Sequence, residues 1–183
     1  MRVRRGPRGG VKIDLVEVEA GILAQCVREL LELLSLPAPD QPPDPLAMMV
    51  GLSPGATLSQ DPALARLLPD AYADDPEAAG DFRRWTEADL RATKVRNAET
   101  MLAALPVGDA RVVLDRDQAD AWLFALNDLR LALGARLEVT EDLALDALDL
   151  DEGRRHGLQV FGWLGLVQES LVEHLVPRPD ASR

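Results

Sequence analysis

The sequence predicts a mainly α-helical protein, a helical bundle of about four long helices plus short helices with a small N-terminal β-hairpin. Apolar residues recur at helical spacing over several long stretches, while β-like runs occur only near the N-terminus and at 111–114. The length of 183 residues, with 47% hydrophobic and 28% charged, fits a single domain over 1–183 that buries its own core.

The first fifteen residues (1–15) predict a basic β-hairpin. Two short runs, 3–5 and 11–15, flank a turn rich in glycine and proline. Asp14 stands where the N-cap of the next helix is expected, and that helix reaches about Leu34.

A proline-rich connection follows at 37–62, which holds seven of the thirteen prolines. Proline at this density excludes a long helix, because each proline removes a backbone donor and blocks helical geometry before it. Short helical turns are expected at 44–50 and 61–68. Each begins with an Asp-Pro pair that supplies the N-cap and the first helical residue.

A further helix begins at Asp75-Pro76 and ends before Pro106, and Phe82 and Trp85 are expected to face inward. The apolar phase slips near Thr86, where Thr-Glu-Ala-Asp resembles a new capping sequence. A kink or break is therefore predicted there. The short run 111–114 is expected to pair with the hairpin as a third strand.

The central helix begins at a capping box formed by Asp115 and Gln118 and ends near Glu138. Apolar residues lie on two of its faces, which is typical of a helix packed by neighbours in several directions. The main stripe consists of Ala119, Trp122, Leu126, Leu129, Leu133 and Leu137.

An acidic segment, 138–152, separates this helix from the last one, which runs from about 152 to Val176 and ends at Pro177. The segment holds seven acids and no base, so we predict a solvated stretch, with a docking surface for a basic partner as the alternative.

Several polar residues interrupt the apolar faces of these last two helices. An unpaired buried polar group costs about 1–3 kcal/mol, so these groups are expected to pair. We expect the two helices to pack together so that Gln168 or Glu169 meets Asn127 or Arg130. The candidate polar cluster consists of Asn127, Arg130, Arg136, Gln168 and Glu169.

Two interpretations of this cluster stay open. One is a structural network that fixes the register of the helices. The other is a ligand pocket in which Arg130 and Arg136 bind an anion. Glycines 134, 162 and 165 are expected to allow close helix approach in either case, because an interior glycine is otherwise unfavourable in a helix.

No catalytic, cofactor or metal site is predicted. Glu152 and His156 have i, i+4 spacing, but no third ligand accompanies them. Cys26 is the single cysteine, which excludes an internal disulfide and predicts a packed thiol in a reducing compartment.

Charge and hydropathy restrict the partners and the location. Residues 1–12 carry five basic residues and no acid, a charge of +5. Because the net charge of the whole chain is −11, residues 13–183 carry −16. This acidity argues against nucleic acid as a partner. No apolar run approaches the ~20 residues that span a membrane, and no secretory signal precedes the domain, so a cytoplasmic location is expected.

Three stretches carry a family resemblance: YADDPEAAGDFRRWTEADLR (72–91), WLFALNDLRLALGARLEVTED (122–142) and GWLGLVQESLVEHL (162–175). Together with LARLLPDAY (64–72), they resemble the blocks of an actinobacterial family, domain of unknown function 2017. The resemblance implies no established activity or catalytic residue. It does imply that members often lie beside the gene for the adaptor of the Clp protease and that some are labelled transcriptional regulators.

The leading prediction is a non-enzymatic regulatory module that binds another protein, with a link to Clp-type proteolysis. A transcription-associated regulator is the first alternative. A regulator of this kind needs a basic helix that contacts DNA. The only locally basic helical stretch of the chain is 83–96, where i, i+4 pairs such as Glu87–Arg91 explain the basic residues. The second alternative is an anion-binding protein or an enzyme that uses Asn127, Arg130 and Gln168. A homodimer is compatible with all three.

Overall fold

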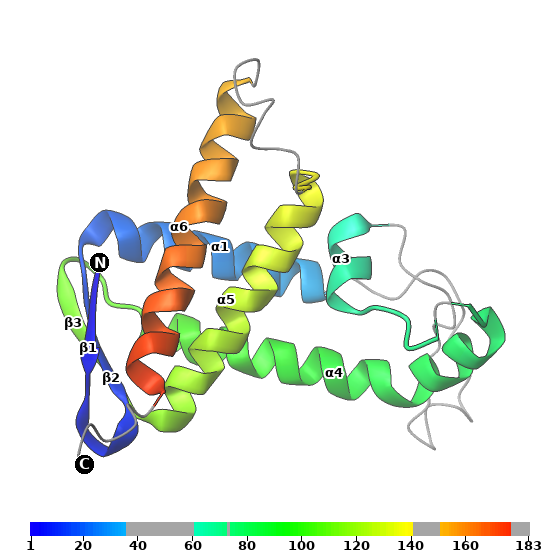
Figure 1. The fold of residues 1–183 in the computed structure, drawn as a ribbon, viewed down its shortest axis with the longest axis horizontal. Coiled ribbons are helices and arrows are strands. Elements are labelled where there is room, and N and C mark those ends of the chain that lie inside the picture. Colours follow the sequence, from blue (N-terminus) through cyan, green and yellow to red (C-terminus); the bar gives the residue numbers. More distant parts are fainter. Residues whose placement is uncertain (36–60, 73, 141–150, 177–183) are drawn as a thin grey trace, which may run out of the picture.

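The computed structural model describes residues 1–35, 61–72, 74–140 and 151–176 and shows a helical body with a small sheet at one end (Figure 1). The predicted fold class is confirmed. The elements, in chain order, are β1 (Arg2–Arg5), a 3-10 turn (Pro7–Gly9), β2 (Val11–Leu15), α1 (Glu17–Ser35), α3 (Pro62–Leu67), α4 (Pro76–Ala104), β3 (Ala110–Leu114), α5 (Arg116–Arg136) and α6 (Glu152–Leu175).

The three strands form one antiparallel sheet in the order β1-β2-β3, which confirms the predicted hairpin and the third strand. Val3 pairs with Ile13, and Ile13 pairs with Val112, so buried apolar side chains from all three strands share one face. Arg8 and Gly9 turn the hairpin with left-handed backbone conformations, at φ 53° and 77°.

Asp14 belongs to β2, so its predicted role as an N-cap is wrong. Its carboxylate accepts hydrogen bonds from Arg4 at 2.7 Å and Arg111 at 2.6 Å, on the two neighbouring strands. The bond from Arg111 lowers the pKa of this carboxyl. α1 begins three residues later, where Asp109 accepts the backbone N–H of Glu17 at 2.6 Å. Local capping rules failed here because the sheet supplies the partners of Asp14.

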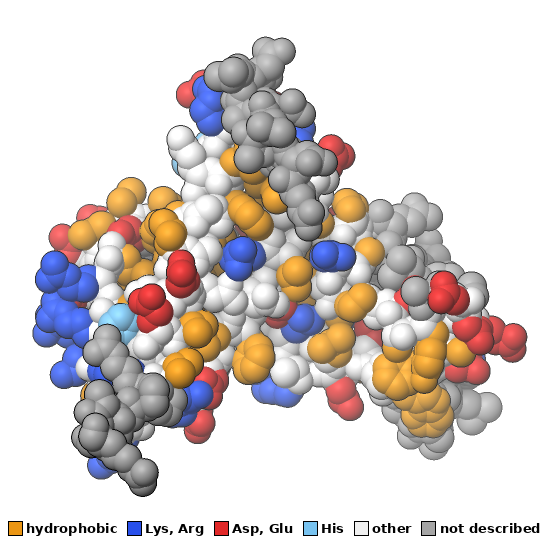
Figure 2. All heavy atoms as spheres, viewed as in Figure 1, with side chains coloured by type: hydrophobic (Ala, Val, Ile, Leu, Met, Phe, Trp, Pro, Cys, Tyr) orange, Lys and Arg blue, Asp and Glu red, His pale blue; other side chains and the backbone are white. Residues whose placement is uncertain are grey.

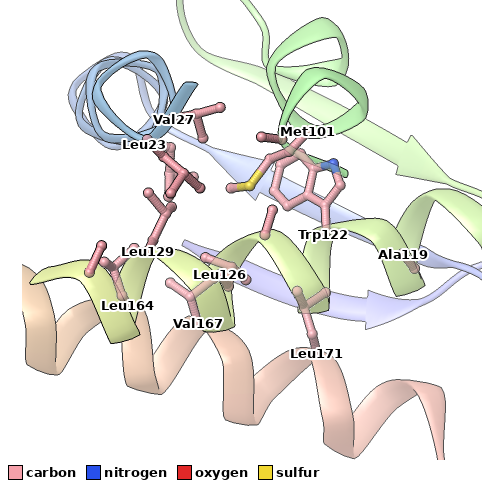
Figure 3. Close-up of a cluster of buried hydrophobic side chains, with 14 of the residues drawn as sticks. Leu23, Val27, Met101, Ala119, Trp122, Leu126, Leu129, Leu164, Val167 and Leu171 are labelled. Carbon is pink, nitrogen blue, oxygen red and sulfur yellow. The ribbon is translucent and has the colours of Figure 1, made fainter. Parts of the chain in front are cut away.

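α5 is the central helix, with α1, α3, α4 and α6 packed against it, as the two apolar faces predict. The predicted capping box at Asp115 and Gln118 is present. Figure 3 shows Trp122 and Leu126 of α5 pointing into a cluster of apolar side chains, with Met101 of α4 beside the indole ring. Trp122 is fully buried in this core.

α4 is one continuous helix, so the predicted break at Thr86 is wrong. The hydroxyl of Thr86 donates to the backbone carbonyl of Phe82 at 2.9 Å instead of capping a new helix. Phe82 and Trp85 are exposed, which also corrects the prediction that they face inward. The apolar phase looked broken because these two residues lie on the solvent side of an unbroken helix.

Arginines from neighbouring elements bind carbonyls at the C-terminal ends of three helices. Arg91 of α4 donates to Leu34 at the end of α1 (2.7 Å), and Arg154 of α6 donates to Leu137 just after α5 (2.9 Å). Arg5 of β1 donates to the carbonyl that follows α6 at 2.8 Å. Terminal carbonyls lack partners within their own helix and carry partial negative charge, so each arginine both caps a helix and ties it to a neighbour.

The short helix predicted at 61–68 is α3, which begins at the N-cap Asp61 and the following proline. Three other predicted features lie wholly or mostly outside the described residues. They are the turn at 44–50, the proline-rich connection at 37–62 and the acidic segment at 138–152.

The predicted close approach of helices at glycine holds at one position and fails at another. A Cβ atom added to Gly134 of α5 would lie 3.2 Å from the ring of Phe161 in α6, whereas one added to Gly162 would meet nothing within 4 Å. Gly134 therefore leaves room for a ring, and Gly162 faces open space.

We expect Gly162→Ala to raise the free energy of unfolding by about 0.5–1 kcal/mol, because alanine is the better helix former and the site is open. Gly134→Ala has the same gain in helix propensity, but its methyl group must displace Phe161, so its net effect is expected to be smaller or destabilising. Urea unfolding of both variants measures the difference. Equal stabilisation would contradict tight packing of α5 on α6 at Gly134.

Candidate functional site

Arg130 and Gln168, two residues of the predicted polar cluster, meet where α5 packs on α6. Arg130 Nη1 donates a hydrogen bond to Gln168 Oε1 at 2.7 Å. The guanidinium carbon lies 5.3 Å from the ring centre of Phe161, within the range of a cation–π contact. Gly165 borders the same guanidinium, because a Cβ there would lie 3.6 Å from Arg130 Nε. Among the described residues, an amide oxygen and an aromatic face contact this guanidinium, and its Nε is buried without a hydrogen-bond partner.

The other three residues of the predicted cluster do not join this contact. Asn127, Arg136 and Glu169 are exposed. Arg136 lines a small cavity together with Cys26 of α1, whereas Arg130 faces α6. The two arginines proposed as anion ligands thus have different surroundings.

Lys94 of α4 and Asp128 of α5 form a buried ion pair that the predicted cluster did not include. Lys94 Nζ lies 2.6 Å from Asp128 Oδ1, and the side chains are 14% and 4% exposed. Burial raises the pKa of Asp128 more than the ammonium of Lys94 lowers it. The pair fixes where α4 crosses α5, and desolvation of its charges offsets their attraction.

The sequence contains a signal for the buried position of Asp128. Ala125 and Ala132 lie three residues before it and four residues after it, and both are buried. Small residues on one helix face permit close approach of a second helix, so a carboxylate among them must meet a group on that helix. The identity of the partner, 34 residues away, follows only from the tertiary structure.

Four of the five basic residues of α4, namely Arg83, Arg84, Arg91 and Lys94, are paired with acids. Arg91 lies 2.8 Å from Glu87, which confirms the predicted i, i+4 pair. Arg83 contacts Asp70 and lies 3.6 Å from Glu87, and Lys94 belongs to the buried pair. This neutralisation argues against α4 as a helix that contacts nucleic acid phosphates.

The N-terminal half of α4 and the segment before it carry a group of exposed apolar side chains. We name Tyr72, Phe82 and Trp85 the aromatic patch; their exposed fractions are 50%, 45% and 62%. The rings of Tyr72 and Phe82 pack edge to face, with centroids 5.9 Å apart. Figure 2 shows apolar side chains gathered over this end of α4, with acidic side chains beside them. Grouped exposed aromatic residues are typical of binding surfaces.

The opposite side of this half of α4 is held by an arginine rather than by large apolar residues. Ala79 and Arg83 are buried there, and Arg83 binds Asp70 in the segment after α3. The sequence signal is the small pair Ala79-Gly80, four and three residues before Arg83, which marks the closely packed side. The aromatic residues are therefore left on the solvent side.

An apolar groove with a volume of about 500 Å³ lies between α1 and the first turns of α6. Val18, Ile22, Cys26 and Val160 are among its lining residues. Burial raises the pKa of the Cys26 thiol, so the thiol is protonated at neutral pH and is a weak nucleophile.

Within the part of the chain that the structure describes, no three His, Cys, Asp or Glu side chains are grouped to hold a metal ion. The helices of that part include none with the length and apolar character needed to cross a membrane.

The chain is similar to one protein family and to proteins from several mycobacteria. A family model described as domain of unknown function (DUF2017) matches residues 1–175. A Mycobacterium leprae protein is 34% identical over 168 residues, which cover 84% of this chain and 77% of the relative. Proteins named oxidative stress regulator AosR, from Mycobacterium bovis and Mycobacterium tuberculosis strain H37Rv, are 32% identical over 186 residues, or 94% of this chain and 84% of each relative. No solved structure matches the chain.

We expect Lys94→Met to lower the free energy of unfolding at pH 7 by about 3–5 kcal/mol, because the Asp128 carboxylate then lies buried without a counter-ion. Adding Asp128→Leu is expected to recover most of this loss, since no buried charge then remains. Urea unfolding of the single and double variants measures both effects.

The loss of folding stability caused by Lys94→Met is expected to depend on pH in a definite direction. Without Lys94, the folded-state pKa of Asp128 rises further above its ordinary value of 3.8, so the folded state holds the proton more tightly than the unfolded state. The stability deficit is therefore smallest below about pH 3.8 and grows as pH rises through the folded-state pKa. A deficit that is constant with pH would contradict the buried, unpaired carboxylate.

Proposed function

This chain belongs to the DUF2017 family, and we propose that it is a regulatory protein that acts by binding another protein through the aromatic patch on α4. The single observation that carries this proposal is the exposure of Phe82 and Trp85 on α4, with Tyr72 in the segment before it, although the other side of the helix is held by Arg83. Trp and Tyr are enriched among the residues that dominate protein–protein binding energy, so a surface of this kind fits a partner.

The names of the relatives support the regulatory part of the proposal. The mycobacterial proteins are called oxidative stress regulators, and their similarity spans 94% of this chain. We extend a regulatory role in oxidative stress to this chain on that basis.

The chemistry of Cys26 favours regulation through binding over direct oxidation of this chain. The sequence has one cysteine and therefore forms no disulfide within itself. Burial also raises the pKa of Cys26, which lowers the fraction of the reactive thiolate. A binding partner would then supply the response to oxidant.

The ion pairs of α4 favour a protein partner over DNA for this regulatory role. Arg83, Arg91 and Lys94 all have acidic partners within the chain. A link to Clp-type proteolysis, which the family resemblance implies, is the first class of protein partner to test, and RNA polymerase is the second.

Affinity capture from native lysate, before and after peroxide treatment, tests the proposal. We expect a partner to be retained by the wild-type chain and by Phe124→Ser, a control at an aromatic residue that is 61% exposed on α5. Trp85→Ser is expected to reduce recovery at least about tenfold, as for a central anchor of an interface. Quantitative mass spectrometry measures recovery, and a full set of partners on Trp85→Ser would overturn the proposed surface.

Cys26 provides a separate prediction. In the folded chain, Cys26 is expected to react with an aromatic disulfide reagent at least about tenfold more slowly than in the urea-unfolded chain, because its raised pKa reduces the thiolate. Absorbance at neutral pH follows the reaction. Cys26→Ser is expected to match the wild-type chain in partner recovery both with and without peroxide. A change of recovery on peroxide treatment that the wild-type chain shows and Cys26→Ser lacks would instead make Cys26 the sensor.

A further inference from the structure

The surface around the aromatic patch is strongly acidic. Residues 69–90 contain seven acidic and two basic residues, a net charge of −5. Both basic residues are engaged: Arg83 is buried against Asp70, and Arg84 lies 3.6 Å from Asp81. The patch therefore faces solvent with negative charge around it.

Carboxylates flank the most exposed ring of the patch on its own helix. Asp81 and Asp89 lie four residues before and after Trp85, so each is one helical turn from the indole on the same side. The Asp81 side chain is 68% exposed, and Asp89 is also exposed. This arrangement matches a cation that stacks on the ring while carboxylates accept its hydrogen bonds.

We infer that the aromatic patch binds a basic protein segment in which arginine or lysine residues flank at least one apolar anchor. The inference rests on the proposed function and specifies the chemistry of the partner. The apolar anchor packs on the rings of Tyr72 and Phe82, and a neighbouring cation is held between Trp85 and the carboxylates of Asp81 and Asp89.

Neither residues 36–60 nor the basic strands β1 and β2 of a second copy fit this surface. Residues 36–60 contain two acids and no basic residue, so they do not complement the acidic surface. The basic strands β1 and β2 of a second copy have the right charge. However, their apolar residues Val3, Val11, Ile13 and Leu15 are buried in the sheet and offer no anchor.

Binding of three labelled peptides of equal length to the full chain tests this inference. The probes are an amphipathic Arg–Leu peptide, a Glu–Leu peptide with reversed charge and an Arg–Ser peptide without apolar anchors. Fluorescence anisotropy is expected to show preference for the Arg–Leu peptide, weakened at least about tenfold by Trp85→Ser and unchanged by Phe124→Ser.

Two matched double variants test how much the carboxylates contribute to peptide binding. Asp81→Asn/Asp89→Asn is expected to weaken Arg–Leu binding and to reduce its sensitivity to salt between about 0.05 and 0.5 M. Glu169→Gln/Glu173→Gln removes the same net charge from exposed positions of α6 and is expected to leave both unchanged. Equal effects of the two double variants would show attraction to net charge alone and would overturn the inference.

The remaining outcomes separate the inference from the proposed function. Trp85-dependent binding of the Glu–Leu peptide at equal strength would overturn the basic partner and leave the binding surface standing. Absence of Trp85-dependent binding by any peptide would count against both. Displacement of the Arg–Leu peptide by a peptide of residues 36–60, or a dimer in sedimentation that Trp85→Ser abolishes, would identify an occupant from this chain and would also overturn the inference.

Discussion

Helix α5 is covered by four other helices, and the charged side chains on its covered faces must therefore find partners inside the fold. Asp128 requires a cation on α4, and Arg130 requires an acceptor on α6. Lys94 and Gln168 meet these requirements, and each contact is specific for one relative position of two helices. The apolar core around Trp122 stabilises the bundle without direction, whereas these polar contacts select the register.

The two halves of α4 are attached to the rest of the fold in different ways. Its C-terminal half buries Ala98 and Met101 in the core beside α5. Its N-terminal half is attached through Arg83, which binds Asp70 and Glu87 with little apolar burial. Polar attachment on that side leaves Phe82 and Trp85 exposed, with the ring of Phe82 packed on Tyr72.

Two features of the structure support the proposal that this protein regulates by binding another protein. The thiol of Cys26 is partly buried with a raised pKa, and the strongest charges inside the fold are already paired. The exposed aromatic patch, by contrast, has no structural use within the described residues that would explain its composition. The rings of Phe82 and Trp85 and the exposed carboxylates of Asp81 and Asp89 lie in the N-terminal half of α4. Groups of these two kinds provide contact area and charge selectivity.

The sequence by itself determined the mainly helical class, the three strands, the capping box of α5 and the packing of neighbours around that helix, because these depend on periodicity and on contacts between near residues. It also limited the polar contact between α5 and α6 to Gln168 or Glu169 with Asn127 or Arg130, since helical wheels identify which polar residues enter an apolar face, and the structure selects Gln168 with Arg130. Three features depend on tertiary contacts: Asp14 lies in the sheet, α4 continues through Thr86, and Lys94 pairs with Asp128. The tertiary structure likewise turned Phe82 and Trp85 outward, because the side of α4 that is buried depends on an arginine contact with a residue outside the helix. Local patterns report the faces of an element, whereas the choice of which face is covered depends on partners that are distant in the chain.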